Sequence, residues 1–123
     1  MVIDTSVFIE FLRAKDKSTT SLWAIPDGTS LFVSSITLYE LYMGATKPDK
    51  WHDVQELLSN IIVLPMTKQI AEEAARVYQD LRRRNALIGH RDIFIGSTAL
   101  VHNLPIKSIN EKHFERIKGL VLL

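Results

Sequence analysis

Apolar residues in this chain gather in short runs that alternate with amphipathic segments, and this pattern predicts most of its secondary structure. Each run has the length of a strand, and the β-branched run Ile61–Leu64 predicts a buried strand. The other expected strands cover residues 1–4, 31–34 and 105–109, with a short edge strand at residues 121–123.

Between these runs, apolar residues recur at the three- and four-residue spacing of amphipathic helices. The longest such stripe covers residues 67–84 and begins at Thr67, whose hydroxyl can cap the helix. The alternation of strands and helices is typical of an α/β protein with a parallel sheet covered on both faces. The other expected helices cover residues 5–13, 35–45, 50–59 and 91–102, with caps from Thr5 or Ser6, from Ser34 or Ser35, and from Asp49.

Composition is that of an ordinary globular protein. Hydrophobic residues make up 46% and charged residues 24% of the 123 residues, and this length suits one domain over residues 1–123. The absence of cysteine excludes disulfides and thiolate zinc sites. No apolar run approaches the roughly 18 residues that span a bilayer, so we expect a cytoplasmic protein without a membrane segment.

Charge is spread unevenly along the chain. The formal net charge is +1, but residues 1–75 carry −4 and residues 76–123 carry +5. The basic part includes a run of three arginines at residues 82–84. This run either contributes to a surface for a polyanion or simply suits the end of a helix, where cations interact well with the dipole.

Four polar residues lie at strand ends or among apolar residues. Asp4 closes the first strand and Asn110 follows the strand 105–109, whereas Glu40 and Asp92 share helix faces with apolar residues. Each has an ordinary explanation when taken alone. Asp4 can cap a helix, Glu40 can be exposed, Asp92 can favour a helix N-terminus, and Asn110 can form a turn.

Taken together, the acidic residues favour a metal site. Ligands of parallel sheets bind at the carboxyl ends of the strands, where Asp4 and Asn110 are expected. Carboxylates gathered there repel one another by roughly 4 kcal/mol per pair at about 4 Å and an effective dielectric near 20, and a divalent cation offsets this repulsion. Oxygen ligands without cysteine or paired histidine select Mg²⁺ or Mn²⁺ over Zn²⁺.

Four segments of the chain resemble, in order, the motifs of the PIN domain. They are VIDTS, SSITLYELYMG, HRDIFIGSTAL and SINEKHFERIKGL, and they extend over nearly the whole chain. Within this family, the chain is similar to the VapC-like ribonuclease toxins of toxin–antitoxin pairs. The resemblance implies a three-layer α/β/α fold with a short, mainly parallel central sheet, a Mg²⁺- or Mn²⁺-dependent endoribonuclease site, a homodimer, and inhibition by a partner antitoxin.

The resemblance also implies roles for individual residues. The three acidic positions of the family fall on Asp4, Glu40 and Asp92, which become catalytic residues and metal ligands. The fourth catalytic position falls on Asn110, which supplies no charge. Hydroxyl groups that support the site fall on Thr5, Ser6 and Ser108.

The expected mechanism uses a metal-bound water. The metal lowers the pKa of this water and offsets charge on the scissile phosphate, and Asp4 or Asp92 orients or deprotonates the water. Basic side chains are expected to contact the phosphates of the RNA substrate. They are Arg82, Arg83, Arg84, Arg91 and Lys112.

Two other functions stay open on sequence alone. A non-catalytic PIN-like module would use the acidic pocket to dock a partner peptide, and a small phosphotransfer or phosphatase domain would carry a nucleophilic aspartate. A surplus of apolar residues on two helices predicts either an interface for a dimer mate or antitoxin helix, or complete burial in a thin fold. These residues are Phe8, Phe11, Leu12, Leu38, Leu41 and Tyr42.

Overall fold

The centre of the molecule is a sheet of four parallel strands in the order β3-β2-β1-β4. The computed structural model describes residues 1–123. Val2 of the central strand pairs with Phe32 on one side and with Ile106 on the other. Leu122 makes a single parallel bridge to Ile106, so the expected C-terminal edge strand is reduced to one bridge. The strands are β1 (Val2–Ile3), β2 (Phe32–Ser34), β3 (Ile62–Leu64) and β4 (Ile106–Lys107).

Six α-helices and one 3₁₀ turn surround this sheet. Two of the expected caps are present, because the hydroxyls of Ser34 and Thr67 accept hydrogen bonds from the N–H groups of Thr37 and Ile70. None of the helices combines the length and the apolar character that crossing a membrane requires. The elements are α1 (Thr5–Arg13), η1 (Lys17–Thr19), α2 (Ser35–Met43), α3 (Pro48–Leu58), α4 (Lys68–Arg83), α5 (His90–Val101) and α6 (Glu111–Phe114).

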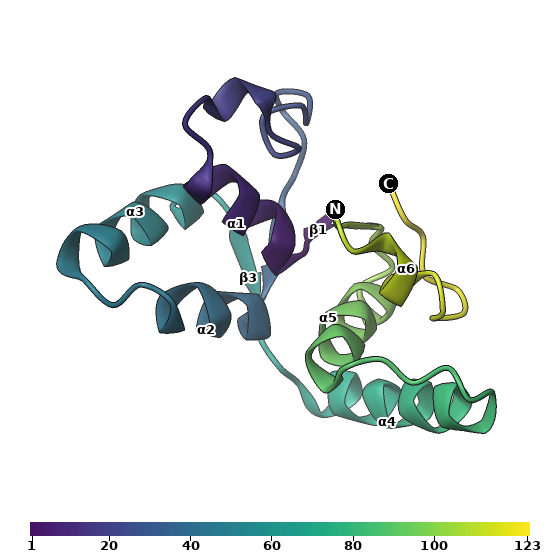
Figure 1. The fold of residues 1–123 in the computed structure, drawn as a ribbon. Coiled ribbons are helices and arrows are strands. Elements are labelled where there is room, and N and C mark those ends of the chain that lie inside the picture. The colour runs from purple at the N-terminus through teal and green to yellow at the C-terminus, as the bar shows by residue number, and fades with distance from the viewer.

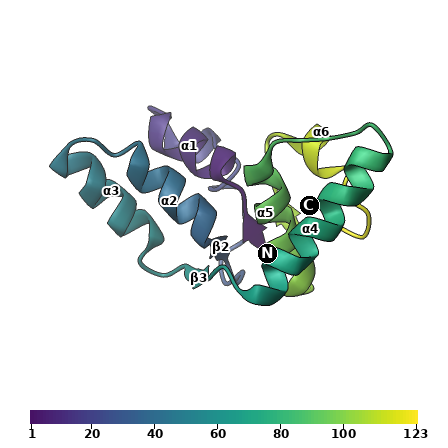
Figure 2. The same cartoon turned by 90° about the horizontal axis from the view of Figure 1, so that it is seen from below.

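The helices cover both faces of the sheet, as Figures 1 and 2 show. Helices α1, α2 and α3 lie on one side, and α4, α5 and α6 lie on the other. Successive residues of a strand point to opposite faces, so Val2 packs with Leu81 and Ile95 in one core while Ile3 packs with Phe8 in the other. The expected α/β/α layering with a short parallel sheet is therefore confirmed.

The β3 strand differs from its prediction. It lies at the edge of the sheet, and Ile62 and Val63 are 56% and 39% exposed, so the expectation of a buried strand is wrong. An apolar run identifies a strand but does not reveal whether another element covers it.

Two helix starts also differ from their predictions. Helix α3 begins at Pro48, which suits the first helical position because its missing N–H has no partner there, and Asp49 is not the cap. Asp4 occupies the N-cap position of α1, but neither it nor Thr5 or Ser6 caps the helix with its side chain. The two hydroxyls bind carboxylates instead.

The surplus apolar residues of α1 and α2 are mostly covered within the chain. Phe8 and Leu41 are buried, and Leu12, Leu38 and Tyr42 pack partly buried against the same core. Complete or partial burial therefore accounts for these five. The large apolar side chains left exposed on this side are others, namely Trp23, Tyr39, Met43 and Trp51.

The C-terminal segment lies very close to α5 at Gly96. A Cβ atom on this glycine would lie 2.6 Å from Cδ1 of Ile117 and 3.6 Å from Cδ1 of Phe114. The missing side chain therefore allows α6 and the residues after it to pack directly on α5, which brings His113 beside the first turn of that helix.

Candidate active site

Asp4 is fixed at the carboxyl end of β1 by two hydroxyl groups. Its side chain is almost completely buried, and its Oδ2 accepts hydrogen bonds from Ser6 Oγ at 2.6 Å and from Ser108 Oγ at 2.8 Å. The N–H groups of Ile109 and Asn110 donate to these same two hydroxyls, which orients them. Oδ1 accepts no hydrogen bond from the protein, so Asp4 is anchored through one oxygen and its other oxygen has no partner.

Glu40 is held from two sides. A chain of buried hydroxyls runs from Ser34 to Thr37 and on to Thr5, whose Oγ1 donates to Glu40 Oε1 at 3.0 Å. The other oxygen, Oε2, accepts a hydrogen bond from Arg91 Nη1 at 2.6 Å. The Glu40 side chain is 11% exposed whereas that of Arg91 is 68% exposed, so the acid belongs to the interior and its cation to the surface.

Asp92 lies in the first turn of α5 and contacts a histidine. Its Oδ2 lies 2.8 Å from Nδ1 of His113 in α6. A partly buried carboxylate needs such a partner, because burial without one is costly. Oδ1 of Asp92 has no hydrogen-bond partner in the protein.

These contacts place the three carboxylates in one carboxylate network at the carboxyl end of the sheet. Hydrogen bonds link Ser108 with Asp4, Thr5 with Glu40, Glu40 with Arg91 and Asp92 with His113, whereas only the backbone connects the other neighbours. The members of the network come from α1, α2, α5 and α6 and from the segments that follow β1 and β4. In order, its members are Asp4, Thr5, Glu40, Arg91, Asp92, His113 and Ser108.

The donors of this network suit a hard divalent cation, because its acidic side chains supply carboxylate oxygens and no sulfur. In the conformation described, no three acidic or histidine side chains converge closely enough to hold an ion, and Arg91 and His113 each contact one carboxylate instead. The side chain of Asn110 is exposed at the end of β4 and makes no hydrogen bond. The metal-ligand and catalytic roles of these residues stay predictions.

Comparison with protein families identifies the domain. The model of the PIN domain matches residues 1–120. The chain belongs to the PIN domain family. This membership confirms the resemblance carried by the four sequence segments.

Known relatives cover nearly the same length as this PIN domain. Ribonuclease VapC1 of Rickettsia felis is 28% identical, over the whole of this chain and 94% of the relative. The DNA-bound VapBC of Salmonella typhimurium has a chain that is 26% identical, with a TM-score of 0.87 over 99% of this chain and 95% of that one. A toxin–antitoxin complex from Klebsiella pneumoniae gives 26% identity and a TM-score of 0.78 over 98% and 94%.

Two residues of the candidate site were not predicted from the sequence. Ser34 and Thr37, with exposures of 1% and 0%, orient Thr5 and thereby Glu40. Their three-residue spacing, continued by Glu40, places polar groups along one helix face and is the signal that could have revealed them.

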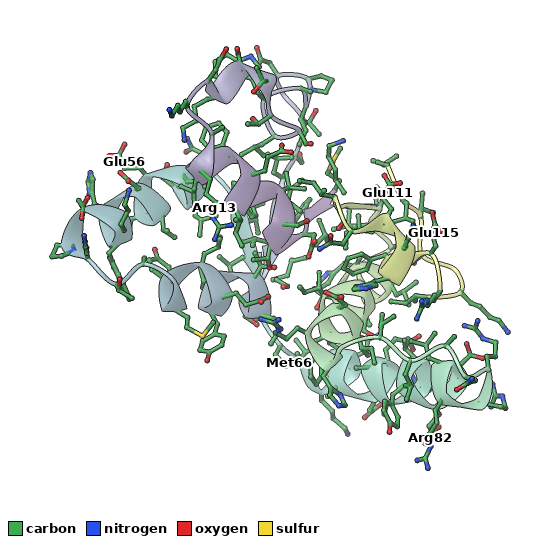
Figure 3. All side chains as sticks on the ribbon, viewed as in Figure 1. Arg13, Glu56, Met66, Arg82, Glu111 and Glu115 are labelled. Carbon is green, nitrogen blue, oxygen red and sulfur yellow. The ribbon has the colours of Figure 1, made fainter.

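A groove of about 400 Å³ also adjoins Glu40, between α1, α2 and α3. Arg13, Lys47 and Lys50 line it, and none of them forms an ion pair. Figure 3 shows Arg13 directed between α1 and the neighbouring helices. These cations lie in the acidic half of the sequence, so the charge distribution along the chain could not indicate them.

The arginine run lies elsewhere. Arg82 projects from the outer end of α4 (Figure 3). Arg83 and Arg84 bind Asp80 at 2.9 and 2.7 Å, and Lys118 approaches the same carboxylate at 3.6 Å. The hydrogen bond from Arg84 holds the pKa of Asp80 below its ordinary value. The helix-end interpretation therefore describes Arg83 and Arg84 well.

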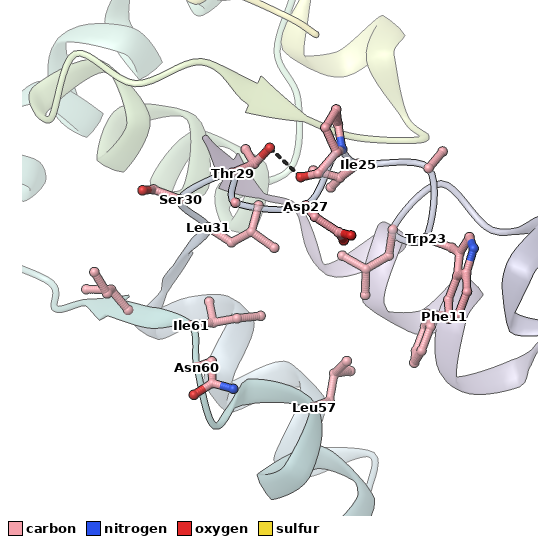
Figure 4. Close-up of a pocket in the computed structure, with 15 residues that line it drawn as sticks. Phe11, Trp23, Ile25, Asp27, Thr29, Ser30, Leu31, Leu57, Asn60 and Ile61 are labelled. Carbon is pink, nitrogen blue, oxygen red and sulfur yellow. Dashed lines mark hydrogen bonds between the residues drawn. The ribbon is translucent and has the colours of Figure 1, made fainter.

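A second hollow opens at the opposite end of the sheet, where β2 and β3 begin. It has a volume of about 800 Å³ and is lined mainly by apolar side chains. In Figure 4, Phe11 and Trp23 border it on one side and Leu57 and Ile61 on the other. It has no acidic cluster, because Asp27 is the only acidic residue along its wall.

Proposed function

We propose that this PIN domain is a metal-dependent endoribonuclease, the toxin of a toxin–antitoxin pair, that hydrolyses phosphodiester bonds of RNA. The observation that carries the proposal is the gathering of Asp4, Glu40 and Asp92, each held by a polar side chain, at the carboxyl end of the parallel sheet. The family match and the relatives named Ribonuclease VapC support the same activity.

The three carboxylates are suited to different tasks. Asp4 and Glu40 are oriented by buried hydroxyl donors, as ligands must be if they are to hold a cation in one place. We assign them, with Asp92, to Mg²⁺ or Mn²⁺. When bound, the cation supplies a water of lowered pKa and offsets charge on the phosphate.

Asp92 is the better placed of the candidates to orient the attacking water or accept its proton. It is more exposed than Asp4, its Oδ1 has no partner, and its Oδ2 contacts His113 Nδ1. With its proton on Nδ1, His113 donates to Oδ2 and so orients Asp92 for this task. Asn110 lies beside this group and can donate its amide to a phosphate oxygen.

The proposed path of the RNA backbone follows the unpaired cations. Arg13, Lys47 and Lys50 line the groove that contains Glu40, and Lys112 is exposed without an ion pair near the β4 end. Arg83 and Arg84 are the weaker candidates because both already bind Asp80. Arg82 is free but points outward from α4.

The test is cleavage of a set of end-labelled single-stranded RNAs by the purified chain, with Mg²⁺ or Mn²⁺ and with EDTA. Cation-dependent cleavage that Asp4→Asn abolishes is the expected result, and Glu115→Gln serves as an exposed control. Partner binding without cleavage of any RNA by the wild-type chain would instead favour the non-catalytic module. Phosphorylation of an aspartate by a small phosphate donor would favour the phosphotransfer domain.

The proposed partner is an antitoxin chain, as in the VapBC and toxin–antitoxin complexes that resemble this chain. The apolar hollow beside Trp23 suits the apolar side chains of such a partner. Co-expression with the protein encoded immediately upstream should yield a stable complex and restore growth. Trp23→Ser should weaken that complex and leave cleavage by the free toxin unchanged.

We also propose a homodimer, formed through the exposed side chains of Tyr39, Met43 and Trp51 on α2 and α3. Clustered exposed apolar residues of this kind favour association. Light scattering after size exclusion should give twice the chain mass. A strict monomer at tens of micromolar protein would exclude this proposal.

A further inference from the structure

Arg91 is the only lysine or arginine that forms an ion pair with a carboxylate of the network. It binds Glu40 Oε2 at 2.6 Å, and its guanidinium makes no other hydrogen bond. We propose that Arg91 is an exchangeable internal counter-ion, which holds Glu40 in the metal-free chain, leaves it when a divalent cation binds, and then contacts a substrate phosphate. This inference rests on the proposed ribonuclease function.

The contact blocks the oxygen that a cation needs. Thr5 already donates to Oε1, so with Arg91 on Oε2 both oxygens of Glu40 are engaged by the protein. Asp4 and Asp92 each keep one oxygen without a partner. Glu40 is therefore the one proposed ligand whose release requires another side chain to move.

The geometry also favours exchange over a permanent ion pair. The Arg91 side chain is 68% exposed and touches Glu40 through one nitrogen only. Water screens an arginine in this position, and such pairs contribute little to stability. Arg84 differs, since two of its nitrogens bind Asp80 and one also binds the carbonyl of Arg116.

Release of Arg91 would leave a free guanidinium at the edge of the candidate site, because its side chain reaches Glu40 from the first turn of α5. A guanidinium binds phosphate through two parallel hydrogen bonds. Substitution of Arg91 should therefore affect the two ligands in opposite directions. Binding of the divalent cation should tighten, and binding of RNA should weaken.

The experiment compares the wild-type chain with Arg91→Gln and with Arg91→Lys, which retains the charge. Calorimetric titration with Mn²⁺ in the absence of RNA should give about a two- to fivefold lower Kd for Arg91→Gln, as the loss of one exposed ion pair implies. Steady-state cleavage at saturating Mn²⁺ should give a raised KM for RNA, with the salt dependence reduced by about one phosphate contact. The Kd of Arg91→Lys for Mn²⁺ should lie closer to that of the wild type.

Arg76→Gln is the matched control, since Arg76 is 65% exposed and pairs with acids of its own helix. An unchanged or weaker affinity of Arg91→Gln for Mn²⁺ would overturn the inference, and so would an unchanged KM. Failure of the proposed function itself has a different signature, because Asp4→Asn would then bind Mn²⁺ as tightly as the wild type. Thermal unfolding of each variant verifies that it is folded.

Discussion

Glu40 and Asp80 are both acidic residues bound by arginine, but their surroundings differ. Three cations surround Asp80 at the outer end of α4, and two of them, Arg83 and Arg84, come from the next turn of the same chain segment. Glu40 has a single cation, 51 residues away, and a buried hydroxyl donor 35 residues away.

Asp80 therefore belongs to a local surface cluster, whereas Glu40 belongs to the candidate site, which the fold assembles from distant segments. Ion pairs spaced three or four residues apart follow from helix geometry, and they adjust the surface without requiring any other part of the fold. The contacts of Glu40 require α1, α2 and α5 to meet at the end of the sheet. Glu40 is partly buried and has one singly bound, exposed cation, whereas three cations bind Asp80.

The largest expected effect concerns cleavage. Glu40→Gln should reduce RNA cleavage by at least about 100-fold, since even the residues that orient metal ligands cost roughly 10–100-fold when removed. Asp80→Asn should stay within about twofold of the wild type, because its ion pairs are peripheral. Cleavage rates at saturating Mg²⁺ measure both. An equal loss of cleavage in the two variants would contradict the assignment of Glu40, and not Asp80, to the active site.

The hydroxyl chain should show an effect of intermediate size. Thr37→Val removes the donor that orients Thr5, so cleavage should fall by about 10-fold and stability by roughly 1–3 kcal/mol. Thr67→Val is the matched control, because it removes the cap of α4, costs about 1 kcal/mol and lies outside the site. Rates and urea unfolding distinguish them. A Thr37→Val enzyme with full activity would exclude an orienting role for the chain.

Binding of a divalent cation should stabilise only the chain with an intact site. At a Mn²⁺ concentration of 100 times its Kd, linkage gives about 2.7 kcal/mol of added stability, which is a Tm increase of about 10 °C. This increase should shrink in Glu40→Gln and persist in Asp80→Asn. Thermal unfolding with Mn²⁺ and with EDTA is the measurement, and an increase retained by Glu40→Gln would argue against its role as a ligand.

The smallest expected effect is the pH dependence of the Asp80 cluster. Because the folded pKa of Asp80 lies below its unfolded value, the cluster stabilises the protein above the unfolded pKa and loses this effect as the pH falls through the folded pKa. Asp80→Asn should therefore lower Tm by roughly 1–2 °C at neutral pH and have no effect at strongly acidic pH. Glu115→Gln, an acid without an ion pair, should show no such pH-dependent difference.

Much of the fold follows from local patterns. The spacing of apolar residues predicts every strand and nearly every helix, and the caps at Ser34 and Thr67 are correct because capping depends on neighbours within three residues. The exposure of β3 was not predictable, because it depends on which element lies beyond the sheet edge. The lengths of β1 and β4 were not predictable either, because a strand extends only as far as its neighbours in the sheet pair with it.

The residues of the candidate site were recognisable by type and position. Asp4, Glu40 and Asp92 stand out in apolar segments, and the family motifs give them an order. Their partners were not recognisable, because each comes from a distant part of the chain. Arg91 was expected at a phosphate and lies against Glu40, while His113 lies against Asp92.

The sequence by itself therefore determines the α/β alternation, the family and the identity of the acidic residues, because these depend on local spacing and on residue chemistry. Only the tertiary structure decides which hydroxyl or cation holds each carboxylate. The reason is that parallel strands bring their carboxyl ends together from segments up to about a hundred residues apart, as when Ser108 donates to Asp4. Contacts between residues so far apart in the sequence cannot be predicted from the local spacing of apolar residues.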